Sequence, residues 1–204
     1  MSALLLHTAQ VHVATFDRLR DEIAPGLALR HVVRPGWLTE ARQGQTEGLD
    51  ARIAELATEA QAAGQSFLCS CTTLGPLVER QGGLRIDRPM MQAAARIGGR
   101  ILLAHALDST RGPSLDLLGS LTDARSQIRA LAIPGAWPLF EAGETARFHA
   151  YIAGAIRADL AARGADVVVL AQASMADAAP LLEDLGLPVL SAPRQAMLAL
   201  ATRE

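Results

Sequence analysis

Cys71, Thr72 and Thr73 form the segment of this sequence that is best suited to chemistry. An apolar run precedes them and a helix is predicted from about Leu74, which places the cysteine at a strand-to-helix turn. The first N–H groups of a helix have no partner within it, and the helix dipole makes this end electropositive. We therefore expect a thiol pKa below that of a free cysteine, and hydroxyl and N–H groups that can hold a carboxylate. The alternative is a buried structural cysteine at a strand end.

A second segment, 167–175, can be aligned with 66–74. Each contains an apolar strand, a turn with a small hydroxyl residue and the start of a helix, and each is followed by a glycine and a short apolar segment that ends in proline. The repeat predicts two similar lobes, and chance similarity in an Ala- and Leu-rich chain is the alternative. Gln172 stands at the position that corresponds to Cys71, and Ala173 and Ser174 follow it.

His7 and Thr8 end the first predicted strand. Ligands of parallel α/β sheets bind at the carboxyl ends of the strands, so both residues are candidates for substrate contact. A neutral imidazole is an effective acid or base near neutral pH, and the alternative for His7 is a hydrogen bond to its own loop. His12 is a weaker candidate, and no metal site is predicted because local spacing supplies no third ligand. The other histidines are expected to be structural or solvated: His31, His105 and His149.

Alternating strands and helices must position these residues, which is the pattern of an α/β fold. Strands are predicted at 3–7, 27–33, 66–70, 100–106, 131–133, 167–170 and 189–190. Helices are predicted at 16–23, 50–63, from about 74, and at 114–130, 142–163, 174–185 and 193–202. We expect two similar lobes, each a mostly parallel sheet flanked by helices, with the cleft between them. Residues 1–95 and 188–204 would form the first lobe and residues 96–187 the second.

Composition excludes several classes of function. The chain has 204 residues, is 50% hydrophobic but only 3% aromatic, and carries a formal net charge of −2 with interspersed signs, so a nucleic-acid partner is not expected. All 19 basic residues are Arg, which excludes a lysine Schiff base and a Walker A lysine. No apolar run is long enough to span a membrane, and a cytoplasmic location is expected. Cys69 is expected in the core. The sequence neither predicts nor excludes a homo-oligomer.

The segments 71–76, 170–175 and 137–143 together resemble the aspartate/glutamate/hydantoin racemase superfamily, and the resemblance spans essentially the whole chain. It implies an enzyme without metal or organic cofactor that acts on a small carboxylate. Many members place one cysteine from each lobe on opposite faces of the substrate, where one thiolate removes the α-proton and the other thiol delivers a proton. Arylmalonate decarboxylases and maleate isomerases are variants of this scaffold.

This sequence departs from the two-cysteine pattern at Gln172, because glutamine cannot titrate and can only donate or accept hydrogen bonds. We expect chemistry at the α-carbon of a small carboxylate or amino acid, with Cys71 as base or nucleophile and His7 or water as the second proton donor. Substrate contacts are expected from Thr8, Thr72, Thr73, Gln172, Ala173 and Ser174. Two alternatives remain: a one-thiol decarboxylase, isomerase or lyase, and an inactive carboxylate-binding or regulatory protein.

Overall fold

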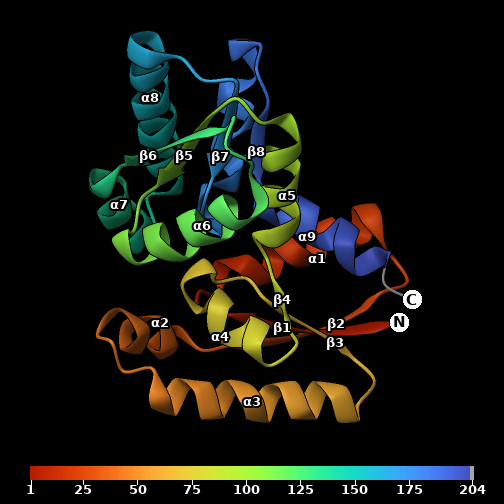
Figure 1. Cartoon of the computed structure of the whole chain (residues 1–204). Coiled ribbons are helices and arrows are strands. Elements are labelled where there is room, and N and C mark those ends of the chain that lie inside the picture. The colour runs from red at the N-terminus through yellow and green to blue at the C-terminus, as the bar shows by residue number, and fades with distance from the viewer. Residues whose placement is uncertain (203–204) are drawn as a thin grey trace. The chain divides into compact units, whose positions relative to one another are not determined.

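The computed structural model describes residues 1–202, the side chain of Glu47 excepted, and divides into two compact α/β units (Figure 1). Unit 1 comprises Met1–Arg88 and the C-terminal segment from Pro193, and unit 2 comprises Pro89–Ala192. In this described part of the chain, each unit contains one four-stranded parallel sheet with helices packed against it. The predicted fold class, two similar α/β lobes, is confirmed.

Unit 1 has the strand order β2-β1-β3-β4. Its strands are β1 (Ser2–His7), β2 (Ala28–Val33), β3 (Ser66–Cys69) and β4 (Leu84–Arg85). Its helices are α1 (Val11–Ile23), α2 (Pro35–Arg42), α3 (Glu47–Ala62), the 3₁₀ turn η1 (Thr72–Leu74), α4 (Gly75–Arg80) and most of α9 (Ala192–Ala201). Because these strands are parallel, all their carboxyl ends lie at one edge of the sheet.

Alternation along β1 separates the two faces of this sheet. Leu4 and Leu6 pack with Trp37, Ile53 and other residues of α2, α3 and α4 in one buried cluster. His7 has the opposite direction from Leu6, and its ring lies against Phe16 of α1. The continuous apolar run of β1 is therefore explained by burial on both faces, as is typical of a parallel sheet.

Unit 2 repeats this arrangement with the order β6-β5-β7-β8. Its strands are β5 (Arg100–His105), β6 (Gln127–Ala132), β7 (Val167–Leu170) and β8 (Val189–Ser191). Its helices are α5 (Arg88–Ile97), α6 (Asp108–Leu121), η2 (Pro134–Ala136), α7 (Trp137–Glu141), α8 (Thr145–Arg163), η3 (Ala173–Ala178) and η4 (Pro180–Leu185). Leu102, Leu170, Phe148 and Ile152 belong to the cluster that packs α8 on this sheet.

Two sequence predictions in unit 2 are wrong. The predicted helix 114–130 is instead the end of α6, a loop and the strand β6. β6 is an edge strand whose Arg129 pairs with Asp159 of α8, so it lacks the apolar pattern that identified the other strands. The sequence also assigns residues 188–204 to the first lobe. This is wrong for β8, because β8 pairs with β7 and so belongs to the sheet of unit 2.

Short elements were the hardest to predict. The sequence predicts no helix directly after the strand 27–33, but Pro35 is the first residue of α2, a position that proline favours. The segment 174–185 forms two 3₁₀ helices instead of one α-helix.

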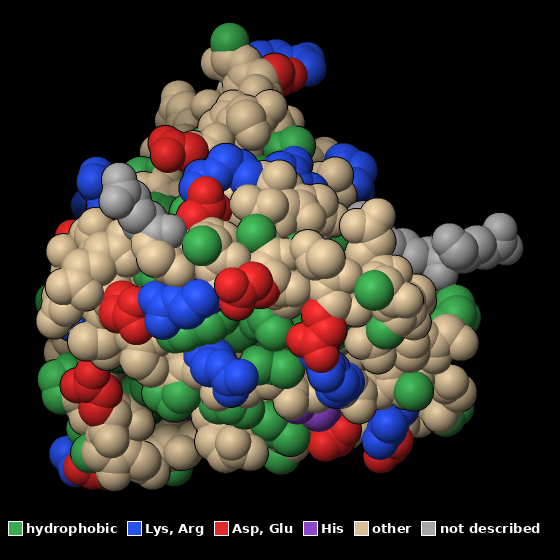
Figure 2. All heavy atoms as spheres, turned by 90° about the horizontal axis from the view of Figure 1, so that it is seen from below, with side chains coloured by type: hydrophobic (Ala, Val, Ile, Leu, Met, Phe, Trp, Pro, Cys, Tyr) green, Lys and Arg blue, Asp and Glu red, His purple; other side chains and the backbone are tan. Residues whose placement is uncertain are grey.

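None of the described helices is both long and apolar enough to cross a membrane. On the face shown in Figure 2, arginine and acidic side chains alternate around hydrophobic ones.

Candidate active site

The pairing of β1 with β3 brings the first group of predicted residues together in unit 1. Leu6 is the partner of Cys69 in this parallel pair, and the Ser70 N–H donates to the Leu6 carbonyl oxygen at 2.9 Å. The chain segments that follow, with Thr8 directly after β1 and Cys71 two residues after β3, therefore lie side by side at the carboxyl edge of the sheet. This is the edge at which parallel α/β proteins bind ligands.

Cys71 sits directly before η1 with an extended backbone (φ −102°, ψ 112°), and its side chain is partly exposed. Hydrogen bonds from the Thr8 hydroxyl, the Thr73 hydroxyl and the N–H groups of Thr73 and Leu74 surround the sulfur. The hydroxyl and N–H groups that were predicted to hold a carboxylate thus donate to the Cys71 sulfur itself. A ligand oxygen at this turn would compete with the sulfur for the same donors.

Burial raises the pKa of the Cys71 thiol above its ordinary value, although the surrounding hydrogen bonds oppose this shift. The expected lowering of this pKa is therefore wrong. The physical reason is that η1 has three residues and α4 only six, so the dipole is too short to offset the loss of water around the sulfur. At neutral pH the resting side chain is a thiol, which is a proton donor.

Cys69 is a core residue, as predicted. It is fully buried in the cluster that contains Leu4 and Leu6, and burial raises its pKa well above the ordinary value. Its sulfur accepts the Cys71 N–H at 3.4 Å and contacts the Cys71 carbonyl oxygen at 3.7 Å. Cys69 therefore holds the backbone of Cys71 in place.

The structure does not support the predicted catalytic role of His7. The side chain is fully buried, Nδ1 lies 2.8 Å from the Ser70 hydroxyl oxygen and Nε2 lies 2.8 Å from Nδ1 of His31. His31 in turn contacts the Asp17 carboxylate at 3.3 Å. Burial and the neighbouring His12 and His31 lower the His7 pKa to about 3. With both nitrogens occupied and no exposed atom, His7 is a structural residue of the sheet.

In unit 2, the second predicted turn is built around the Gln172 side chain, which is 7% exposed. Its Oε1 accepts the backbone N–H groups of Ala106 at 2.6 Å and Leu107 at 2.9 Å. These groups precede α6, a helix of 14 residues, so the amide oxygen occupies donors that an anion would otherwise use. These two donors fix the position of Oε1 and therefore the orientation of the whole amide group. The Nε2 donor is directed away from the Ala106 and Leu107 N–H groups.

Ala173 and Ser174 open η3 directly after Gln172. Ala173 is buried, Ser174 is partly exposed, and the Ser174 carbonyl oxygen lies 3.0 Å from Nε2 of His149. His149 is thus structural, as expected. Sequence reasoning missed the N–H groups of Ala106 and Leu107, although a buried glutamine at a turn is itself a signal that such partners exist.

Changing Gln172 tests its two hydrogen bonds. Gln172→Leu leaves two buried N–H groups without a partner, and we expect a loss of about 2–4 kcal/mol of unfolding free energy. Gln172→Glu keeps two acceptor oxygens and should lose less than about 1 kcal/mol, while it removes the amide donor. Urea denaturation of the two variants measures both values. Equal stability of Gln172→Leu and the unchanged protein would contradict this assignment.

The structure thus yields two separate sets of residues. Unit 1 brings together Thr8, Cys71, Thr72 and Thr73, with Thr72 largely buried. Unit 2 brings together Gln172, Ala173 and Ser174. In residues 1–202 no group of three or more His, Cys, Asp or Glu side chains is arranged to hold a metal ion.

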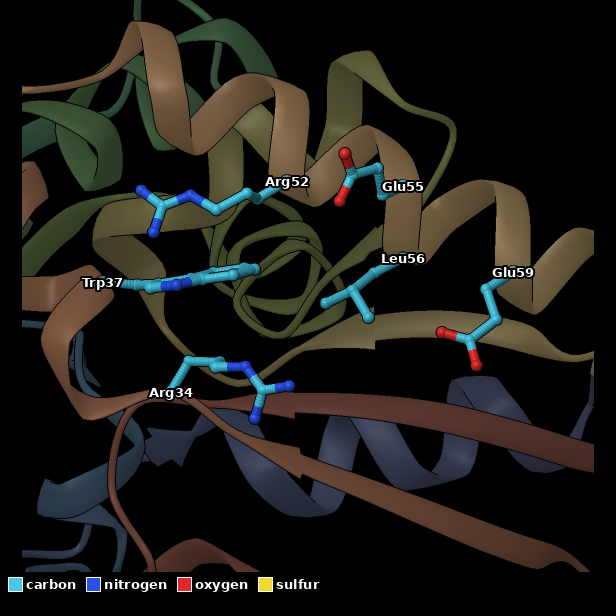
Figure 3. A pocket seen from close by; sticks show the side chains of 6 residues that line it. All are labelled: Arg34, Trp37, Arg52, Glu55, Leu56 and Glu59. Carbon is cyan, nitrogen blue, oxygen red and sulfur yellow. The ribbon is translucent and has the colours of Figure 1, made fainter.

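A separate cavity of about 280 Å³ lies elsewhere in unit 1, between the end of β2, α2 and α3 (Figure 3). The Arg52 guanidinium lies over the Trp37 ring at 5.1 Å and pairs with Glu40, while Glu59 pairs with Arg30. None of the candidate residues described above lines this cavity. Its lining residues are Arg34, Trp37, Arg52, Glu55, Leu56 and Glu59.

Solved structures with similar folds include racemases and a decarboxylase. Allantoin racemase from Klebsiella pneumoniae has a TM-score of 0.70 at 16% identity, over 98% of this chain and 86% of its own. Aspartate racemase from Picrophilus torridus has a TM-score of 0.72 at 15% identity, over 98% and 92%. A variant of arylmalonate decarboxylase has a TM-score of 0.60 at 16% identity, over 98% and 93%.

The chain therefore shares its fold with these racemases and this decarboxylase, and the predicted resemblance is confirmed for the fold. No family model matches the sequence, and no curated protein matches it either.

Proposed function

We propose that this chain is an enzyme that acts at the α-carbon of a small carboxylate or amino acid, with Cys71 as its acid–base residue and without metal or organic cofactor. The observation that carries the proposal is the Cys71 thiol at the carboxyl edge of the unit 1 sheet, ringed by the hydroxyl and N–H donors of Thr8, Thr73 and Leu74. A sulfur held in this way can exchange a proton at one fixed position.

In the proposed step a water molecule in the site accepts the α-proton, and the electron pair of the broken C–H bond is delocalised into the substrate carboxylate. The Thr8, Thr72 and Thr73 hydroxyls and nearby N–H groups stabilise this charge by hydrogen bonds. The Cys71 thiol then gives its proton to the α-carbon and keeps the S–H electron pair as a thiolate, which solvent reprotonates. Delivery to the face opposite the lost proton inverts the centre.

Unit 2 contributes hydrogen bonds, not a second thiol, in this proposal. The Nε2 group of Gln172 donates to a substrate oxygen, and the Ser174 hydroxyl and the Ala173 N–H hold the carboxylate. The support is the fixed amide orientation, which directs Nε2 away from the Ala106 and Leu107 N–H groups. Whether the two sets act on one ligand is tested by combining Gln172→Ala with Cys71→Ala, since residues that share a substrate show non-additive effects.

Decarboxylation is the second candidate, and the raised pKa of Cys71 favours it. In this reaction the bond between the α-carbon and one carboxylate of a malonate-type substrate breaks, and its electron pair stays on the α-carbon. A protonated thiol supplies the proton that forms the new C–H bond. No base is needed, so one thiol suffices.

One assay separates these functions. The protein is incubated in D₂O with L-aspartate, L-glutamate, allantoin or phenylmalonate, and the products are followed by ¹H NMR. Loss of the α-proton signal with unchanged substrate concentration supports the racemase, and conversion of phenylmalonate to phenylacetate supports the decarboxylase. Calorimetric binding of these compounds without either reaction would contradict an enzyme and would identify a carboxylate-binding protein.

A further inference from the structure

The cavity between β2, α2 and α3 of unit 1 carries two opposite charges without an ion-pair partner among the described residues (Figure 3). The Arg34 guanidinium donates to the Val33 carbonyl oxygen at 3.0 Å and contacts no carboxylate within residues 1–202. Most arginines of this chain pair with a carboxylate, so Arg34 is an exception. Glu55 of α3 likewise forms no ion pair or hydrogen bond in the described part of the chain.

The other two charged side chains of this lining already have partners. Arg52 pairs with Glu40, and Glu59 pairs with Arg30 at 2.8 Å. The hydrogen bond to Glu40 is the main cause of the raised pKa of Arg52, and Glu55 adds to it only as a more distant charge. The two charges that remain without an ion pair are therefore the ones that a ligand can neutralise.

Trp37 of α2 adds a free hydrogen-bond donor to this cavity. The side chain is only 7% exposed, its indole N–H donates to no described residue, and the nitrogen is not sealed from solvent. A donor without a protein partner in a side chain so largely buried is uncommon. The Arg52 guanidinium lies 5.1 Å from the centre of the ring, and Figure 3 shows Arg34 on the other side of the ring plane.

The remaining surface of the cavity is apolar and small. Leu56 of α3 lies beside the Trp37 ring, and both belong to the buried cluster of this unit. The volume of about 280 Å³ is at the lower end of the range of about 300–1,000 Å³ that is typical of ligand sites. A cavity of this size suits an amino acid and not a nucleotide.

We propose that this cavity binds a zwitterionic α-amino acid with an apolar side chain, at a site separate from Cys71. Arg34 and the Trp37 N–H donate to the ligand carboxylate, and the Glu55 carboxylate accepts a hydrogen bond from the ligand ammonium. Leu56 and the Trp37 ring pack against the ligand side chain. This inference does not rest on the proposed function, because none of these residues belongs to the turn that holds the thiol.

A zwitterion matches these charges better than a dicarboxylate does. Glu55 and Glu59 are four residues apart on α3, so they lie on the same wall of the cavity. This wall repels a second negative charge on a ligand and attracts an ammonium group. Hydrogen bonds between charged groups are the stronger ones, so both ends of the ligand contribute to affinity.

Tryptophan fluorescence can report on this site directly. The chain has two tryptophans, so Trp137→Phe leaves Trp37 as the single indole emitter. This protein is titrated with three compounds that differ only at the α-carbon: L-phenylalanine, 3-phenylpropionate without the ammonium, and benzylmalonate with a second carboxylate. Excitation at the red edge of indole absorption avoids the ligands. We expect a saturable change in emission, with L-phenylalanine bound about tenfold or more tightly than either analogue.

Variants in the same background test the two charges. Arg34→Gln and Glu55→Gln change exposed side chains, so each should weaken L-phenylalanine binding about tenfold or more while the melting temperature changes by less than about 3 °C. Arg18→Gln is the matched control, because Arg18 is an exposed arginine of α1 that does not line the cavity. Its affinity for L-phenylalanine should equal that of the parent, as should the affinity of Cys71→Ser.

Three results would overturn the proposal. The first is the absence of a saturable change up to the solubility limit of L-phenylalanine. The second is equal or tighter binding of 3-phenylpropionate or benzylmalonate, which would exclude a site for a zwitterion. The third is loss of L-phenylalanine binding in Cys71→Ser with full binding in Arg34→Gln, which would place the ligand at the thiol turn and leave the proposed function intact.

Discussion

Cys71→Ser is expected to lower the rate of α-deuterium exchange, or of phenylmalonate decarboxylation, about 10²–10⁴-fold, the range typical of a lost general acid or base. The serine hydroxyl fits the same space and can keep the hydrogen bonds from Thr8, Thr73 and Leu74. Its proton is far less acidic than that of a thiol, so it cannot be delivered at a useful rate. The loss should appear in kcat, because substrate contacts from the threonines remain.

The control for this variant is its stability. Cys71 is partly exposed and its replacement by serine is nearly isosteric, so the melting temperature should change by less than about 3 °C. An unchanged kcat in a folded Cys71→Ser protein would contradict the assignment of Cys71. A similar drop in kcat and in the melting temperature would point to a structural effect instead.

Acid is expected to destabilise unit 1 well above the pH at which carboxylates are protonated. Burial lowers the pKa of His7 to about 3 and that of His12 to about 4, against an ordinary value of 6.5. The groups that face this cluster are Ser70, His31, Phe16 and, through His31, the Asp17 carboxylate. The Asp17 carboxylate is the negative charge among them, and it contacts His31 rather than His7.

The direction of the effect follows from proton binding. Below pH 6.5 the unfolded chain takes up protons at both histidines, while the folded chain does not until the pH approaches 4 and then 3. Stability is therefore full above pH 6.5 and falls as the pH drops through this window. At about 1.4 kcal/mol per unit of pKa difference, each histidine removes about 3 kcal/mol by pH 4.

Urea denaturation of the protein and of His7→Gln between pH 7 and pH 4.5 measures this effect. The variant starts less stable, but its unfolding free energy should fall roughly half as steeply with decreasing pH, because one of the two buried imidazoles is gone. Parallel slopes for the two proteins would show that His7 does not carry the pH dependence.

The two turns that define the candidate site could be predicted because local rules specify them. An apolar strand followed by small polar residues and a helix start placed Cys71 at the end of β3 and Gln172 at the end of β7. The internal repeat then predicted two similar sheets. These inferences need only short segments of sequence and the geometry of parallel strands.

Properties that depend on distant partners could not be predicted. The thiol pKa depends on how completely the fold excludes water from Cys71, which its neighbours in the sequence do not reveal. The role of His7 depends on the Ser70 hydroxyl and the His31 ring, which distant parts of the sequence bring to it.

Ligand protection of Cys71 against alkylation tests the central claim most directly. The protein is treated with iodoacetamide at several pH values, with and without saturating L-aspartate or phenylmalonate, and both cysteines are quantified by peptide mass spectrometry. We predict that Cys71 is alkylated slowly at pH 7 and faster as the pH rises, that one of the carboxylates slows this reaction, and that buried Cys69 stays unmodified as the internal control. Alkylation of Cys71 at the same rate with and without every carboxylate tested would contradict a carboxylate site at this thiol.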